Sequence, residues 1–163
     1  MLDKDKWISK ERIRWSTRFS IPTSEKMPQP FPQSTVQTQR ALCAISVACP
    51  DKLTPCFEAL YHAFWVEGQT PIGKPEVFGP VLSKILGEQQ CKEILQKASE
   101  PEAKKMLSDN TNSAIEEGAF GLPWFITTNA QGEKEGFWGF DHLGQVVDHL
   151  GLEREGEGYK AML

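Results

Sequence analysis

The segment Gly121-Leu122-Pro123 holds the first residues of this sequence whose types and spacing could serve chemistry. Pro123 opens an apolar run, residues 123–128, that is rich in aromatic and β-branched residues and predicts a strand. Proline is usually kept out of strand interiors. Two interpretations are open: a trans proline that begins the strand, or a cis proline, found in about 5–6% of X-Pro bonds. A cis bond leaves the backbone N–H and C=O of Leu122 unpaired, where a peptide-like ligand could add as a strand.

Asp141 and His142, at the start of the last expected helix, are the second chemically capable group. Asp is a good helix N-cap on its own, and a ligand role is the alternative for Asp141. His142 is either a solvated residue of the first helical turn or a ligand group or titratable base.

The cysteines, by contrast, indicate no site. The sequence has four of them, Cys43, Cys49, Cys56 and Cys91. None forms a CxxC pair, their spacing matches no zinc pattern, and the three histidines add no ligand cluster. We expect no metal, and buried reduced thiols in an intracellular, cytoplasmic protein.

Length and composition indicate a folded domain of ordinary type. The chain has 163 residues, of which 39% are hydrophobic and 25% charged, with a net charge of −4. An acidic balance disfavours nucleic acid as a partner. No apolar run approaches the roughly 20 residues of a membrane helix, and the charged N-terminus does not resemble a secretory signal. We therefore expect neither a membrane nor a nucleic-acid partner.

Helical periodicity dominates the chain and then gives way to a strand pattern. Ser34 and Gln37 have the spacing of a capping box. Prolines 22, 28, 30 and 32 predict an extended loop before it. Helices are expected at 4–19, 34–49, 53–68, 74–87, 88–99 and 100–118, strands at 123–128 and 134–139, and a last helix at 141–151.

The expected fold class is mainly α with one small antiparallel β-hairpin. A two-stranded hairpin is marginal in water unless helices or more strands cover it. The hairpin here is therefore expected either to be covered by the helices or to be completed by another chain.

The segment from Gly118 to Gly151 resembles the C-terminal part of kappa-class glutathione transferases and the related 2-hydroxychromene-2-carboxylate isomerases, of the DsbA-like thioredoxin superfamily. Those proteins have Gly-x-Phe-Gly-x-Pro, a hairpin, and then Phe-x-Gly-x-Asp-Arg; this chain has Gly118 to Pro123 and then Phe137 to His142. The loop at 28–32 and the helix around Arg40 are also similar. The resemblance implies a helical domain, 1–112, followed by the C-terminal half of a thioredoxin-like domain, 113–163.

The resemblance also implies roles for individual residues. The backbone of Leu122, beside a cis Pro123, would bind the cysteinyl part of glutathione, and Asp141 would bind its γ-glutamyl ammonium. Phe140 replaces a small polar residue and His142 replaces an arginine, which weakens the case for glutathione. The strand, helix and strand that carry the family's thiolate-activating serine have no counterpart in this sequence. Catalytic residues are therefore unknown, and glutathione conjugation is expected to be near background.

Two functions of different class are expected from these observations. The first is a kappa-type transferase or isomerase acting on a small hydrophobic substrate, with glutathione bound weakly or not at all. The second is a non-catalytic, small-molecule-binding or dimerising remnant of the family, or the product of a truncated gene model. Either could use a hydrophobic pocket or homodimer interface formed by large rings, for which the candidates are Trp65, Trp124, Phe125 and Trp138.

Overall fold

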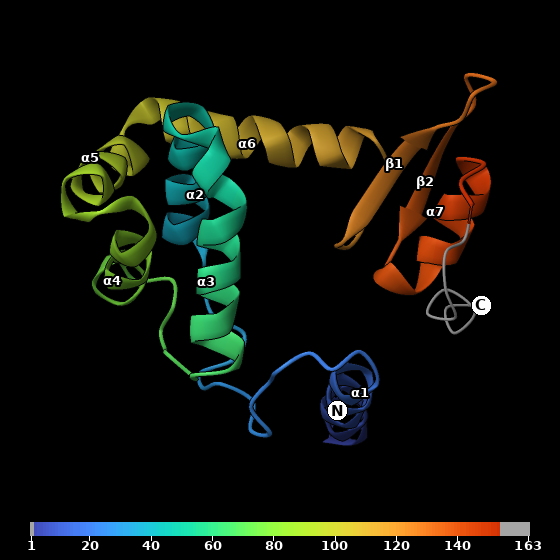
Figure 1. Cartoon of the computed structure of the whole chain (residues 1–163), viewed down its shortest axis with the longest axis horizontal. Coiled ribbons are helices and arrows are strands. Elements are labelled where there is room, and N and C mark those ends of the chain that lie inside the picture. The colour runs from blue at the N-terminus through green and yellow to red at the C-terminus, as the bar shows by residue number, and fades with distance from the viewer. Residues whose placement is uncertain (1, 154–163) are drawn as a thin grey trace. The chain divides into compact units, whose positions relative to one another are not determined.

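The computed structural model describes residues 2–153 and divides into two compact units, which meet between Leu107 and Ser108. The first unit contains helices α1 (Leu2–Arg18), α2 (Val36–Ala48), α3 (Leu53–Trp65), α4 (Pro75–Leu86) and α5 (Glu88–Ser99), with a short 3₁₀ turn, η1 (Pro50–Lys52). The second contains strands β1 (Trp124–Thr128) and β2 (Lys134–Trp138), a 3₁₀ turn, η2 (Phe140–His142), and helix α7 (Leu143–His149). Helix α6 (Pro101–Glu116) spans the division (Figure 1).

The described fold is mainly α with one antiparallel hairpin, as the sequence predicts. The predicted domain boundary, between residues 112 and 113, falls inside α6. Residues 154–163 of the predicted second domain lie outside the described residues.

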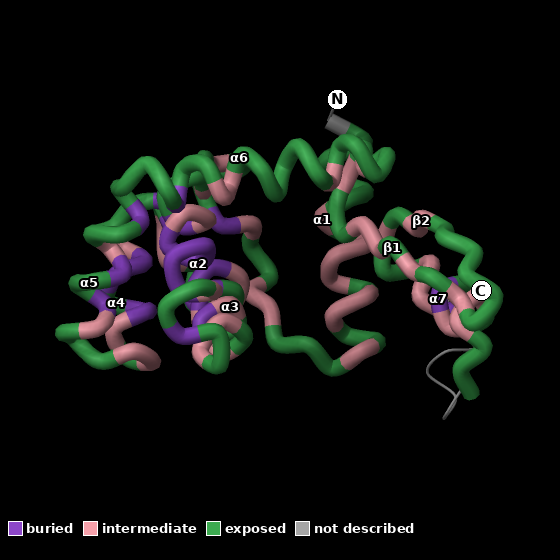
Figure 2. Tube along the Cα trace, turned by 90° about the horizontal axis from the view of Figure 1, so that it is seen from above, coloured by how far each residue is buried: buried purple, intermediate pink, exposed green. Residues whose placement is uncertain are grey.

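The core of the first unit lies between helices α2, α3, α4 and α5 (Figure 2). Its largest fully buried side chains are Phe78, Ile45, Leu82, Ile94 and Cys56. Helix α2 packs on α5, and α4 packs on both α3 and α5. Burying one large apolar side chain stabilises the folded chain by about 1.5–3 kcal/mol. This cluster is therefore the main source of stability among the described residues of the first unit.

Turn residues set the ends of these helices where the sequence places them. Pro75 occupies the first turn of α4, where the N–H that proline lacks has no helical partner anyway. Gly87 ends α4 with a φ of 81°, a conformation that glycine adopts without strain. The short link then lets α5 begin at Glu88 and fold back on α4.

Arg12 fastens α1 to the loop that follows it. Its guanidinium donates hydrogen bonds to Thr23 Oγ1 (2.7 Å) and to the carbonyl oxygens of Ser24 (2.8 Å) and Glu25 (2.9 Å). It also lies over the ring of Trp65, 5.9 Å from the centroid. One side chain thus joins the first helix, the proline-rich loop and the end of α3.

The hairpin of the second unit pairs Trp124 with Trp138 and Phe125 with Phe137, in an antiparallel register. Helix α7 packs against both strands, and the ring of Phe137 contacts that of His149 at 5.8 Å between centroids. Lys134, at the start of β2, forms an ion pair with Glu117, just past α6. Helix α7 therefore covers the face of the hairpin that carries Phe137.

Two local predictions are wrong. Ser34 is not the N-cap of α2, because Thr35 precedes the first helical residue and no side-chain capping bond forms. The backbone of Ser34 instead packs so closely on Gly73 that a Cβ there would lie 1.8 Å from the Ser34 carbonyl oxygen. The last α-helix begins at Leu143 rather than Asp141, because Gly139 (φ 90°) turns the chain into a 3₁₀ segment first.

Candidate functional site

One hydrogen bond brings the two predicted glutathione-binding segments together. The N–H of Gly139 donates to the carbonyl oxygen of Pro123, at 2.9 Å. Pro123 follows Leu122, and Gly139 precedes Phe140, Asp141 and His142. Segments that lie 16 or more positions apart in the sequence therefore form the two sides of one small surface.

Leu122 presents its backbone at this surface. The Leu122–Pro123 peptide bond is cis, and the Leu122 side chain is 81% exposed. Among the described residues, no hydrogen-bond partner is found for the N–H or the C=O of Leu122. The N–H can donate a hydrogen bond to a peptide-like ligand, and the C=O can accept one from it.

The outer edge of β1 continues this surface. Gly139 donates to Pro123 and Asn129 donates to Glu133, so the odd-numbered residues from 123 to 129 bond across the hairpin. In an antiparallel pair, the backbone groups of the alternate residues then point away from the partner strand. These belong to Trp124, Ile126 and Thr128, and within the described sheet, which has two strands, this edge is unpaired.

Asp141 lies at the second side of the surface with its carboxylate exposed to solvent. It lies within η2 and caps neither η2 nor α7, since no side-chain capping bond is present at either segment. Its Oδ1 is 3.5 Å from Nδ1 of His142, a nitrogen that is buried and has no hydrogen-bond partner among the described residues. Asp141 thus keeps acceptor positions open to a cationic group.

Three aromatic rings gather on the open face of the hairpin. Phe120 contacts Trp124 and Trp138, with centroids 5.5 and 5.1 Å apart, and is itself 74% exposed. Two glycines make room for the indoles: a Cβ on Gly121 would lie 2.5 Å from Trp138, and one on Gly136 would lie 2.5 Å from Trp124. Phe120 was not among the predicted residues, although its place in Gly-x-Phe-Gly could have indicated it.

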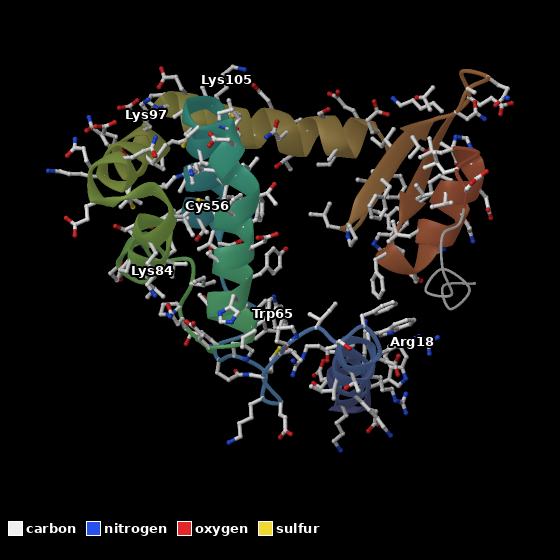
Figure 3. All side chains as sticks on the ribbon, viewed as in Figure 1. Arg18, Cys56, Trp65, Lys84, Lys97 and Lys105 are labelled. Carbon is white, nitrogen blue, oxygen red and sulfur yellow. The ribbon has the colours of Figure 1, made fainter. Side chains whose placement is uncertain are left out.

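The four aromatic residues predicted for a pocket or interface lie on different faces of the hairpin and in different units. Trp124 and Trp138 are direct partners on one face, and Phe125, which pairs with Phe137, points to the opposite face, where α7 packs. Trp65 belongs to the first unit, at the end of α3 (Figure 3).

Trp65 lines a cavity of about 270 Å³ that lies wholly within the first unit. Helices α2 and α3 supply its buried floor, which includes Leu42, Leu60 and Phe64. Phe31 and Pro32, from the proline-rich loop, line its exposed mouth, and the rings of Phe31 and Trp65 contact each other at 6.0 Å. Sequence reasoning missed most of these residues, although Phe57, Leu60, Tyr61 and Phe64 share one helical face at spacings of three and four.

All four cysteines are buried and free. Loss of solvent, with smaller contributions from neighbouring Cys49 and Cys91, raises the pKa of Cys56 from 9.0 to about 11. Burial likewise raises the pKa of Cys43 and Cys91. A thiol held protonated is a poor nucleophile, so these residues act as core side chains.

Two further features of the described residues bear on the site. Nowhere between residues 2 and 153 do three or more His, Cys, Asp or Glu side chains gather in a way that could hold a metal ion. Over the same residues, no helix has the length and apolar character needed to cross a bilayer.

Comparisons with known proteins give the family of the chain and several relatives. The family model of the DsbA-like thioredoxin domain matches residues 4–151, and the chain belongs to that family. Glutathione S-transferase kappa 2 of Caenorhabditis elegans is 26% identical over 156 residues, covering 90% of this chain and 66% of the relative. Glutathione S-transferase kappa 1 of Rattus norvegicus is 25% identical over 153 residues, covering 91% and 66%.

The human protein, glutathione S-transferase kappa 1, is 22% identical over 118 residues, covering 72% of this chain and 51% of that protein. The chain thus spans about two thirds of the length of the curated relatives it matches, or less. These names indicate a glutathione-transferase-like or DsbA-like protein.

Proposed function

We propose that this protein is a kappa-type glutathione transferase or isomerase that acts on a small hydrophobic substrate. The observation that supports the proposal is the hydrogen bond between Gly139 and Pro123, which joins the segment that carries the unpaired backbone of Leu122 to the segment that carries the exposed carboxylate of Asp141. A strand edge next to an acid complements a short peptide that has a free ammonium group.

Glutathione fits this pair of groups. Its cysteinyl residue would exchange backbone hydrogen bonds with Leu122, and its γ-glutamyl ammonium would pair with Asp141. Phe140 offers no side-chain donor for the glutamyl carboxylate, so binding is expected to be weak. His142, whose Nδ1 is 3.5 Å from Oδ1 of Asp141 and makes no hydrogen bond among the described residues, is a further candidate for contact with the peptide.

The cavity at Trp65 supplies a place for the hydrophobic substrate. No catalytic residue is assigned within residues 2–153. Binding of each ligand within its own unit is the contribution proposed for the described residues.

The second candidate is a binding or dimerising protein without catalysis. It is favoured by the open face of the hairpin, where Phe120 is 74% exposed and Trp138 is 48% exposed. Exposed apolar faces and unpaired strand edges are usually covered by a partner. We propose a homodimer that pairs the β1 edges and buries Trp124 and Trp138. Because this edge continues to Leu122, the dimer favours the second candidate over a peptide ligand at the same edge.

The two candidates are separated by titration and by turnover. Calorimetric titration with glutathione is expected to show weak binding by the natural chain and by the control Glu135→Gln, and loss of binding by Asp141→Asn. Glu135 is an exposed acid on β2, so its replacement removes the same charge away from the site. Binding that survives in Asp141→Asn would remove the proposed site.

A turnover assay with glutathione and an electrophilic aryl halide then tests transferase activity. Conjugation that falls in Asp141→Asn and persists in Glu135→Gln supports a transferase. Glutathione binding without conjugation supports an isomerase or a binding protein, and an isomerase would be recognised by turnover of an aromatic substrate in which no thiol is consumed.

A further inference from the structure

We infer that the cavity at Trp65 takes a neutral, two-ring aromatic molecule with one hydrogen-bonding group directed at its mouth, and that it excludes anions, glutathione included. The inference rests on the proposed function only in calling that molecule a substrate. The binding itself follows from the described residues of the first unit.

The volume sets the size of the ligand. The cavity measures about 270 Å³. An apolar cavity of about 150 Å³ in another protein is large enough to bind benzene. The space at Trp65 therefore has room for two fused rings with one small substituent, and it is below the volume that a drug-sized ligand usually fills.

The lining sets the polarity and shape. The buried floor is apolar except for Thr38, and aromatic rings from Phe31, Phe57, Tyr61, Phe64 and Trp65 supply much of the wall. These rings already pair with one another: Phe57 stacks on Tyr61, and Phe64 meets Trp65 edge to face at 4.8 Å. A flat aromatic ligand can continue both kinds of contact, which stabilise ring pairs beyond simple burial.

No Asp, Glu, Lys, Arg or His is among the residues that line the cavity. Arg12 lies 5.9 Å from the centroid of the Trp65 ring, but it does not line the cavity. Its terminal nitrogens donate to Thr23, Ser24 and Glu25, and its Nε is buried. An anion placed here would lose its hydration and gain no countercharge, which is costly in an apolar site. The cavity therefore selects against carboxylates.

Three polar groups at the rim can orient a neutral ligand. They are the hydroxyls of Thr35 and Tyr61 and the amide of Gln39, all of which line the cavity. Among residues 2–153, none of these three side-chain groups has a hydrogen-bond partner. In contrast, the hydroxyl of Thr38, deeper in the cavity, donates to the carbonyl oxygen of Ile72 at 2.9 Å and is available only as an acceptor. Gln33, which follows Phe31 and Pro32 in the loop at the mouth, also lines the cavity, and its buried Oε1 has no partner among the described residues. The ligand's polar group is thus expected at the mouth and its rings at the floor.

A pair of isosteric probes tests the class of ligand. Calorimetric titration of the full chain at neutral pH with 2-naphthol is expected to give one saturable site with a Kd of roughly 10 µM to 1 mM, ordinary for so few atoms. With 2-naphthoate, which has the same rings and a negative charge, binding is expected to be at least about tenfold weaker. Equal binding of the two probes, or no binding of 2-naphthol, would overturn the inference.

A matched pair of variants tests the location. Gln39→Trp places an indole at the cavity, and Gln37→Trp places the same indole on an exposed position of the same helix that does not line it. Gln39→Trp is expected to weaken 2-naphthol binding at least about tenfold, and Gln37→Trp is expected to leave it within about twofold. If both variants unfold at the same temperature as the natural chain and both still bind, the cavity is not the site.

Two nearly isosteric substitutions test whether the hydroxyls at the rim bind the polar group of the ligand. The double variant Thr35→Val, Tyr61→Phe is expected to weaken 2-naphthol binding at least about threefold and to leave the binding of 2-methylnaphthalene unchanged. An equal loss for both ligands would overturn the assignment of the rim.

These results are independent of the glutathione titration. Binding of 2-naphthol at the cavity, with no glutathione bound and no turnover, would reject the proposed function and leave this inference standing. Glutathione binding and conjugation without 2-naphthol binding would do the opposite.

Discussion

The carboxylate of Asp141 lies over the backbone of Gly139, in the space that a side chain on residue 139 would fill. A Cβ at this position would be 2.3 Å from Oδ1 of Asp141, and Gly139 has a φ of 90°. Glycine is therefore required at position 139 for two reasons: it allows the backbone conformation, and it leaves room for the carboxylate of Asp141.

Replacing Gly139 by alanine is expected to move Asp141 and to abolish glutathione binding. The added strain should lower the free energy of unfolding by about 1–3 kcal/mol. Gly132→Ala is the control, since Gly132 also has a positive φ (83°) but nothing lies within 4 Å of its Cβ position. Titration and urea unfolding of both variants measure the effects. Unchanged glutathione binding in Gly139→Ala would contradict the role of Asp141.

Replacing Gly136 by alanine is expected to push the indole of Trp124 away from β2. A Cβ on Gly136 would lie 2.5 Å from that ring. Such overpacking should cost about 1–3 kcal/mol and alter the near-ultraviolet circular dichroism of the tryptophans. Glu135→Ala, at the adjacent exposed strand position, serves as the control. A Gly136→Ala chain with natural stability and an unchanged spectrum would show that the rings pack differently.

Replacing Arg12 by methionine is expected to loosen the wall of the cavity. The Ser24 N–H and the Thr23 hydroxyl donate to the carbonyl oxygen of Trp65. Arg12 in turn donates to the Thr23 hydroxyl oxygen and to the Ser24 carbonyl oxygen. Stability should fall by about 1–3 kcal/mol, and hydrogen exchange at Ser24 should accelerate. Arg14→Met is the control because Arg14 forms an ion pair with Glu11 at the surface, and such exposed pairs contribute little to stability. Equal effects of the two variants would argue against a positioning role for Arg12.

Stability is expected to fall as the pH rises from 9 to 11. The folded chain keeps the proton on Cys56 to about pH 11, whereas the unfolded thiol loses it near 9.0, so rising pH favours the unfolded chain in this window. Once both states have lost the proton, the free energy of unfolding is lower by about 2–3 kcal/mol because of Cys56. Urea unfolding at pH 8 and 10.5 measures it, and Cys56→Ala should show a smaller decrease. The same decrease in both chains would assign the effect to other groups.

The proposed homodimer predicts a mass that depends on one face of the hairpin. Light scattering should give twice the chain mass, and Ile126→Lys, on the open face beside the β1 edge, should give the monomer. Val47→Lys is the control, since Val47 is also exposed but lies on α2. A monomer across a wide range of concentration in the natural chain would reject the dimer.

The order and type of the elements could be predicted because their signals are local. Helix period, Pro75 and Gly87 place α4, and the exchange of that period for β-branched and aromatic residues places the hairpin. The Gly-x-Phe-Gly-x-Pro segment likewise indicated the family, since each of its residues serves a turn or a close contact that few other residues allow.

The tertiary structure decided what depends on distant residues. It joined the segments of Leu122 and Asp141 through the bond from Gly139 to Pro123, and it put Phe125 on the other face from Trp124 by the alternation of the strand. It also prevented Ser34 from capping α2, because packing on Gly73 outweighs a capping bond worth about 1 kcal/mol. The cavity at Trp65 has no signal of its own in the sequence, since a cavity is the space that side chains from several elements leave unfilled.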